Sequence, residues 1–98
     1  MYKDIITYEL AESTTKEQLI KIAKQIVNDW MKNQIGFVKW EIHVNSDGSY
    51  TDIVCWKSKE DAKTAEKEMV NIPNASQWYG CYKEGSISSK SLTTIAEF

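Results

Sequence analysis

The chain of 98 residues contains no arginine, and lysine supplies all 12 of its cationic side chains. Without guanidinium groups, the protein cannot make the bidentate contacts by which arginine recognises phosphate or guanine. The net charge is −2, and no basic patch stands out along the sequence. These absences argue against nucleic acid as a partner.

Cysteine, histidine and long apolar runs are also scarce. Cys55 and Cys81 lie far apart in the sequence and match no metal-ligand spacing, so we expect no metal site. No segment approaches the roughly 20 apolar residues that cross a bilayer, and the first ten residues are too polar for a signal peptide. We therefore expect no membrane partner and a reduced, cytoplasmic protein. The four scattered glycines form no phosphate-binding loop, and no cofactor is expected.

Two segments have the features of helices. Apolar residues three and four positions apart predict a long helix over residues 16–33, capped by one threonine of the Thr14-Thr15 pair. Ser58 caps a second predicted helix. Its inner face would be formed by Ala62, Ala65 and Met69. Pro73 ends this helix, and a short helical turn is expected over residues 75–79.

Apolar and β-branched stretches predict four strands. They cover residues 5–10, 37–44, 50–56 and 91–98. The order is β-α-β-β-α-β, so we expect one domain over residues 1–98 of the α+β class. Its fold would be ferredoxin-like, with a four-stranded antiparallel sheet and two helices on one face. Large side chains also point to the other face, and a second copy of the chain would cover them in a homodimer.

The register of the hairpin decides which polar side chains meet. A two-residue Asp47-Gly48 turn places His43 opposite Asp52. One face then gathers Glu41, His43, Tyr50, Asp52 and Trp56. A three-residue loop instead pairs His43 with Thr51 and places Asp52 beside Ile42. We favour the two-residue turn, because it separates the polar from the apolar side chains more cleanly.

His43 and Asp52 are therefore the candidate catalytic residues, since a histidine oriented by a carboxylate can act as a base near neutral pH. The alternative is a structural cross-strand pair, which contributes about 0.2 to 1 kcal/mol. Aromatic side chains are numerous and would stack on a small planar aromatic ligand. Two of them follow Pro73, where a flap over a pocket would lie. The candidate ligand-binding residues are Glu41, Tyr50, Trp56, Trp78 and Tyr79.

Several short stretches carry a resemblance to a known family. These are GF before the second predicted strand, DG in the hairpin, and DIVCWKSKEDA, which runs from Asp52 through Trp56 into the helix start at Ser58. The later NIPNASQWYGCY is similar to a proline-containing segment of the same proteins. Together they resemble the dimeric α+β barrel superfamily, in particular small bacterial proteins of the antibiotic biosynthesis monooxygenase type.

The resemblance implies a homodimer whose two sheets close into a shared barrel, with a pocket between sheet and helices in each subunit. Members include cofactor-free monooxygenases of polyketide-like phenols, haem-degrading enzymes and small-molecule isomerases. In a monooxygenase of this kind, His43 or Asp52 would remove a proton and the substrate would supply the carbanion. The haem-degrading branch uses a histidine in the second helix region, and residues 58–82 contain none. The alternative function is a ligand-binding or structural homodimer without turnover.

Overall fold

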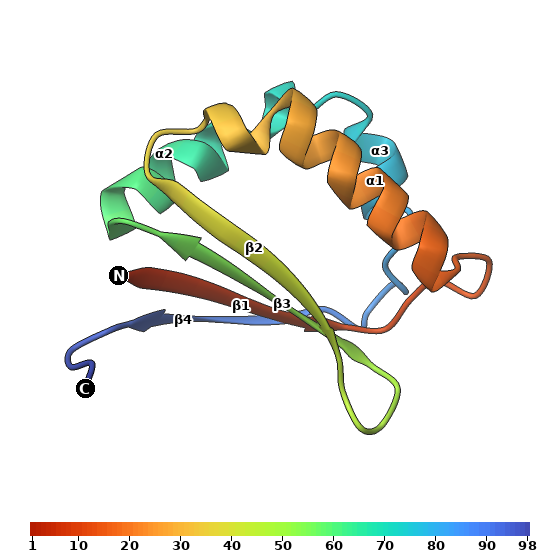
Figure 1. The fold of residues 1–98 in the computed structure, drawn as a ribbon. Helices are drawn as coiled ribbons and strands as arrows, with labels where there is room; N and C mark the ends of the chain where they lie inside the picture. Colours follow the sequence, from red (N-terminus) through yellow and green to blue (C-terminus); the bar gives the residue numbers. More distant parts are fainter.

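A computed structural model describes residues 1–98 and has one sheet with helices on one of its faces (Figure 1). The elements are β1 (Tyr2–Tyr8), α1 (Lys16–Asp29), β2 (Phe37–Val44), β3 (Tyr50–Trp56), α2 (Lys59–Glu68), α3 (Ala75–Tyr79) and β4 (Ser88–Thr93). The four strands pair antiparallel in the order β2-β3-β1-β4. The predicted ferredoxin-like α+β fold is confirmed.

The first helix begins with a capping box. Thr15 Oγ1 accepts a hydrogen bond of 3.2 Å from the Gln18 backbone N–H, and the Gln18 side chain accepts one of 2.8 Å from the Thr15 N–H. The helix was predicted to continue to residue 33, but α1 ends at Asp29 and a 3₁₀ turn follows. The backbone of Trp30 leaves the helical conformation at φ −142°, and its side chain is buried in the core.

The connection from β3 into α2 depends on one glycine. Ser58 Oγ caps α2 by accepting from the Asp61 N–H at 3.1 Å. Gly36 lies against this helix start with φ +80°, and a Cβ at that position would collide with the Asp61 side chain. The Lys57 N–H donates to the Gly36 carbonyl at 2.8 Å, which ties the start of β2 to the end of β3.

The hairpin between β2 and β3 has a three-residue loop. Asn45 N–H donates to the Ser49 carbonyl at 2.7 Å, and Gly48 has φ +89°, as a type I turn followed by a left-handed residue requires. His43 therefore pairs with Thr51, and Asp52 pairs with Ile42. The two-residue register that we favoured is wrong, and the three-residue alternative is confirmed.

The first and last strands of the chain differ from their predicted ranges. β1 begins at Tyr2 rather than residue 5 because it is a central strand, paired from its first residue with both β3 and β4. β4 starts at Ser88 and ends at Thr93 rather than running to residue 98. Thr93 lies opposite Tyr2, so β1 offers almost no further residues with which the tail could pair.

The core lies between the sheet and the helices. Thirteen buried residues form one cluster that joins β1, β3 and the three helices, and it includes Trp30. Ala62 and Ala65 of α2 are buried as predicted, whereas Met69 is half-buried in a 3₁₀ turn after the helix. None of the helices combines the length and apolar character needed to cross a bilayer.

Candidate functional site

Asp52 is a carboxyl group enclosed between the sheet and the helices. Side chains alternate along a strand, so Asp52 shares a face with Val54 and Trp56, which both belong to the core. Only 1% of Asp52 is exposed, and it is the sole charged residue of the chain that is buried. The Tyr8 hydroxyl of the neighbouring strand donates a hydrogen bond of 2.8 Å to its Oδ1 atom. No cation pairs with it.

This environment makes Asp52 a stronger base than an exposed carboxylate. Burial raises the pKa of Asp52 from 3.8 to about 6, although the Tyr8 hydroxyl and the nearby Trp40 indole oppose the change by stabilising the charged form. Burial and the adjacent Asp52 raise the pKa of Tyr8 far above its usual range. At neutral pH, Tyr8 therefore keeps its proton, and Asp52 is an ionised acceptor with a pKa suited to general base catalysis.

A continuous series of five aromatic rings borders Asp52, and we call it the aromatic arc: Tyr50, Tyr8, Tyr82, Trp78 and Trp40. Tyr50 stacks on Tyr8 with ring centroids 5.9 Å apart, and Tyr8 lies 4.4 Å from Tyr82. Trp78 then meets Tyr82 at 5.1 Å and Trp40 at 4.9 Å, both edge to face. The arc thus connects β1, β2 and β3 with α3 and the segment that follows it.

Two indole N–H groups on this face have no hydrogen-bond acceptor. Nε1 of Trp40 and Nε1 of Trp56 are both buried and form no hydrogen bond, although the Trp40 indole lies near enough to Asp52 to stabilise its charged form. A buried donor without an acceptor costs about 1–3 kcal/mol, so such groups are uncommon in folded proteins. Trp40 belongs to the arc, and Trp56 packs against Phe37 with centroids 5.8 Å apart. These donors are suited to an acceptor oxygen on a bound molecule.

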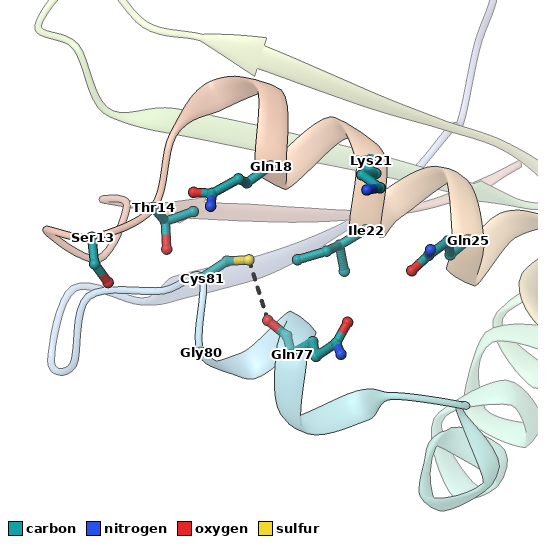
Figure 2. A pocket seen from close by; sticks show the side chains of 9 residues that line it. All are labelled: Ser13, Thr14, Gln18, Lys21, Ile22, Gln25, Gln77, Gly80 and Cys81. Atoms are coloured by element: carbon teal, nitrogen blue, oxygen red, sulfur yellow. Dashed lines mark hydrogen bonds between the residues drawn. The ribbon is translucent and has the colours of Figure 1, made fainter.

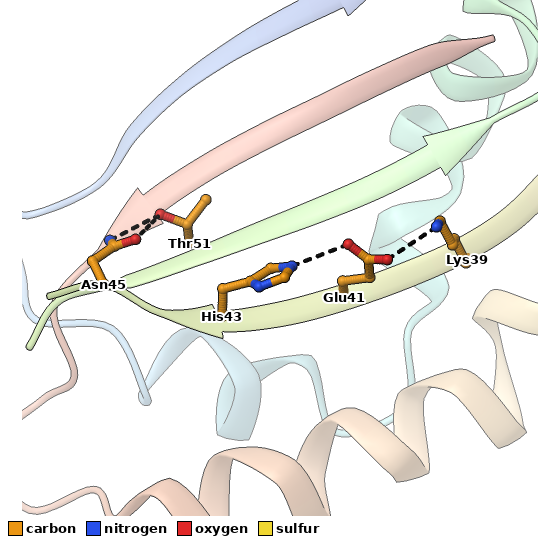
Figure 3. A network of polar contacts seen from close by, with 5 residues as sticks. All are labelled: Lys39, Glu41, His43, Asn45 and Thr51. Atoms are coloured by element: carbon orange, nitrogen blue, oxygen red, sulfur yellow. Dashed lines mark hydrogen bonds and ion pairs between the residues drawn. The ribbon is translucent and has the colours of Figure 1, made fainter. Parts of the chain in front are cut away.

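The predicted pairing of His43 with Asp52 does not occur. Lys39, Glu41 and His43 lie on the sheet face away from the helices, opposite to Asp52 (Figure 3). There Glu41 bridges its two neighbours, at 3.0 Å to the lysine and 3.0 Å to the histidine. Half of the His43 side chain is exposed. The three-residue loop causes this separation, because a shift of one residue moves a side chain to the other face.

The structure places three of the five predicted ligand-binding residues near Asp52 and the other two elsewhere. Tyr50, Trp56 and Trp78 lie on the helix side with Asp52, and Trp78 is 7% exposed. Tyr79 is 50% exposed and lies outside the arc, while Glu41 is on the opposite sheet face.

Sequence reasoning also missed three members of the arc. These are Tyr8, Trp40 and Tyr82. Once the hairpin register is known, the alternation of side chains assigns the two strand residues Tyr8 and Trp40 to the face of Asp52. No local pattern signals Tyr82, which lies in an irregular segment and reaches the site only through tertiary packing.

Two of the surface hollows bear on access to the site, and Asp52 lines neither of them. One, of about 570 Å³, lies between α1 and α3 and is mostly polar, with Cys81 donating to the Gln77 carbonyl at 3.3 Å (Figure 2). The other, of about 680 Å³, lies between the hairpin tip and the end of β1, and Tyr8 and Tyr50 form part of its wall. No group of three or more histidine, cysteine or acidic side chains is arranged to hold a metal ion.

No family model and no curated protein matches the sequence. Among solved structures, SnoaB, a cofactor-independent oxygenase from Streptomyces nogalater, matches with a TM-score of 0.76 and 13% identity over 98% of this chain and 94% of that one. A monooxygenase from the gene ActVA-Orf6 of Streptomyces coelicolor, in complex with nanaomycin D, matches with a TM-score of 0.63 and 17% identity. The match covers 99% of this chain and 89% of that one. A MhuD mutant with two manganese protoporphyrin IX bound per active site matches with a TM-score of 0.74 and 14% identity, over 100% of this chain and 98% of that one.

Identities this low establish the fold alone. Two further similar structures are described as an antibiotic biosynthesis monooxygenase and a putative one from Chloroflexus aurantiacus. The chain therefore has the fold of the antibiotic biosynthesis monooxygenase-like proteins. The resemblance inferred from sequence is confirmed at this level.

Proposed function

We propose that the protein binds a small aromatic or polyketide-like molecule between its sheet and helices, and oxygenates it without a metal or organic cofactor. The observation that carries the proposal is the buried Asp52 carboxylate, which accepts from Tyr8 and has no cationic partner. Its raised pKa suits a base, and the aromatic arc suits a planar substrate. A cofactor-independent oxygenase of the same fold adds support by analogy.

The proposed reaction converts an activated CH₂ group of an anthrone-like substrate into a carbonyl. Asp52 removes a proton, and the resulting carbanion passes an electron to O₂. Recombination of the two radicals gives a peroxide that takes up a proton, and elimination of water leaves the ketone. The balance is one CH₂ and one O₂ consumed, with one C=O and one H₂O formed. The Trp40 N–H group, which lies near Asp52, would stabilise the oxygen that becomes negative when the proton leaves.

The site does not fit haem. The only histidine of the chain is His43, which lies on the sheet face opposite to the aromatic arc and is bonded to Glu41. It cannot reach a ligand placed between the sheet and the helices.

We further propose that two copies of the chain pack sheet to sheet. The face away from the helices carries the apolar pair Ile5 and Ile53 at its centre and Leu92 on β4, with Lys3, Glu41 and Lys90 beside them. Beyond β4, the side chains of Ile95 and Phe98 are fully exposed, and they would find apolar partners on a second copy. Native mass spectrometry tests this: a dimer that Ile53→Asp converts to a folded monomer is expected, and a monomeric wild-type protein would contradict it.

A second candidate function is binding without turnover. It is favoured by the near-complete enclosure of Asp52, which lines neither of these two surface hollows. In this case the arc would bind a planar molecule whose oxygens accept from the Trp40 indole. Oxygen consumption distinguishes this function from the first.

The test measures oxygen uptake with anthrone, corrected for its spontaneous oxidation, and incorporation of one ¹⁸O atom from ¹⁸O₂ into the product. Asp52→Asn should lower turnover by about 10²-fold or more, because it removes the base but keeps an acceptor for Tyr8. His43→Ala is the matched control and should leave turnover unchanged. Oxygen uptake that persists in Asp52→Asn would show that Asp52 is not the base. Ligand binding without oxygen uptake in the wild-type protein would support only the second function, binding without turnover.

A further inference from the structure

We propose that the hollow between the β2–β3 hairpin tip and the end of β1 is the entrance to the Asp52 site, and that Tyr50 closes it. An incoming flat aromatic molecule takes the stacking position of Tyr50 on Tyr8. Tyr50 thereby selects ligands by the shape of their rings. This inference rests on the proposed function, since it concerns access to the same carboxylate.

The wall between this hollow and Asp52 is one side chain thick. Tyr8 lines the hollow, and its hydroxyl also donates to the Asp52 carboxylate at 2.8 Å. Tyr50 lines the same hollow and stacks on the Tyr8 ring. Displacement of Tyr50 alone would therefore bring a ligand against the tyrosine that contacts Asp52. The hollow between α1 and α3 offers no such route, because none of its lining residues belongs to the aromatic arc.

Tyr50 is the less enclosed member of the stacked pair. It is the first residue of β3, directly after the hairpin loop, and it is only half-buried. Its strand partner Val44 is 64% exposed, so little packing holds this corner of the sheet. Tyr8, by contrast, is 1% exposed and is held by its bond to Asp52 and by contact with Tyr82. Rotation of Tyr50 towards solvent breaks no hydrogen bond between side chains.

The geometry of the pair specifies the class of ligand. The two rings are 20° from parallel with centroids 5.9 Å apart, so a molecule that replaces Tyr50 must be flat and aromatic. The walls of the hollow include Asp47 and Glu9 and no cationic side chain. Hydrogen bonds from Ser49 lower the pKa of Asp47, which therefore stays charged. A neutral phenol should enter more readily than an aromatic carboxylate of the same size.

The experiment measures binding of 1-naphthol and 1-naphthoate to the full chain by stopped-flow quenching of tryptophan fluorescence. Tyr50→Ala should raise the association rate of 1-naphthol about tenfold, because the closed state no longer limits access. Tyr50→Leu, which keeps an apolar but shorter side chain without the ring, is the second variant in case the first fails to fold. Gln77→Ala, in the other hollow, is the control and should leave the rate unchanged.

The outcomes separate this inference from the proposed function. Binding at an unchanged rate in the Tyr50 variants, or a faster rate in Gln77→Ala, would overturn the entrance while leaving oxygenation intact. Faster binding in the Tyr50 variants, together with no oxygen consumption in the presence of anthrone, would support the entrance and contradict the proposed oxygenation. Weaker binding of 1-naphthoate that Asp47→Asn relieves would confirm the charge preference. If no variant binds either probe, both proposals are wrong.

Discussion

Replacement of Asp52 by asparagine is expected to remove a specific pH dependence from the stability of the protein. Burial raises the pKa of Asp52 to about 6, whereas an unfolded chain has its ordinary value of 3.8. Between these pH values the folded protein holds a proton that the unfolded chain has released. The stability contributed by the neutral carboxyl is therefore fully present below the unfolded pKa and is lost as the pH rises through the folded one.

The magnitude follows from the size of the pKa difference. About two pKa units correspond to about 3 kcal/mol of free energy of unfolding, lost between roughly pH 4 and pH 7. Asparagine has no charge to bury and can still accept from Tyr8 through its Oδ1 atom. The variant should therefore gain about 3 kcal/mol relative to the wild-type protein across this range. The difference in unfolding free energy between the two proteins at any one pH also depends on the new amide N–H₂ group, but the slope of that difference against pH does not.

Equilibrium urea unfolding, followed by tryptophan fluorescence at fixed protein concentration, checks this expectation from pH 4 to pH 8. The quantity to plot is the difference in unfolding free energy between Asp52→Asn and the wild-type protein. Other carboxylates, such as Glu41 and Asp47 with their lowered pKa values, are common to both proteins and cancel in the difference. A difference that stays constant across this range would refute the assignment of a raised pKa to Asp52.

Two further substitutions test neighbouring features. Tyr8→Phe removes the donor that stabilises the Asp52 carboxylate, so the pKa of Asp52 should rise and the pH-dependent loss of stability should extend to higher pH in the same titration. Gly36→Ala should destabilise the protein by about 1–3 kcal/mol, measured as a lower midpoint of thermal unfolding, because its φ is +80° and its Cβ meets Asp61. Gly85→Ala is the matched control, since Gly85 has φ +81° and open space around it; equal losses in the two variants would contradict the collision.

The sequence predicted the starts of the helices and the two hairpin strands well, because their signals are local. Thr15 and Ser58 begin α1 and α2 as hydrogen-bond capping requires, and both strands of the hairpin have their predicted bounds. The end of α1 was missed because the apolar spacing continues past residue 29, while the backbone leaves the helical conformation at the buried Trp30. The end of β4 depends on where β1 begins, which is a property of the sheet and not of residues 94–98.

The hairpin register was predicted wrongly because two physical criteria disagree. Separation of polar from apolar side chains favours a two-residue turn, which would have placed Asp52 with Glu41 and His43. The local chemistry of the loop favours three residues, since Asp47 accepts from both the backbone and the hydroxyl of Ser49. The hairpin adopts the three-residue loop, and this register places the Asp52 carboxylate on the apolar face of the sheet. Burial patterns cannot predict this position, because it costs stability.

That cost is itself an argument about function. An uncompensated loss of about 3 kcal/mol is large beside the 5–15 kcal/mol by which domains are typically stable. Asp52 forms no ion pair, and its only direct hydrogen bond comes from Tyr8, whose hydroxyl would otherwise need another acceptor. A hydrophobic residue and a phenylalanine at these two positions would pack the same face without a buried charge. A pair that is so costly to the fold, near the Trp40 indole donor that forms no hydrogen bond, is expected where a bound molecule uses those groups.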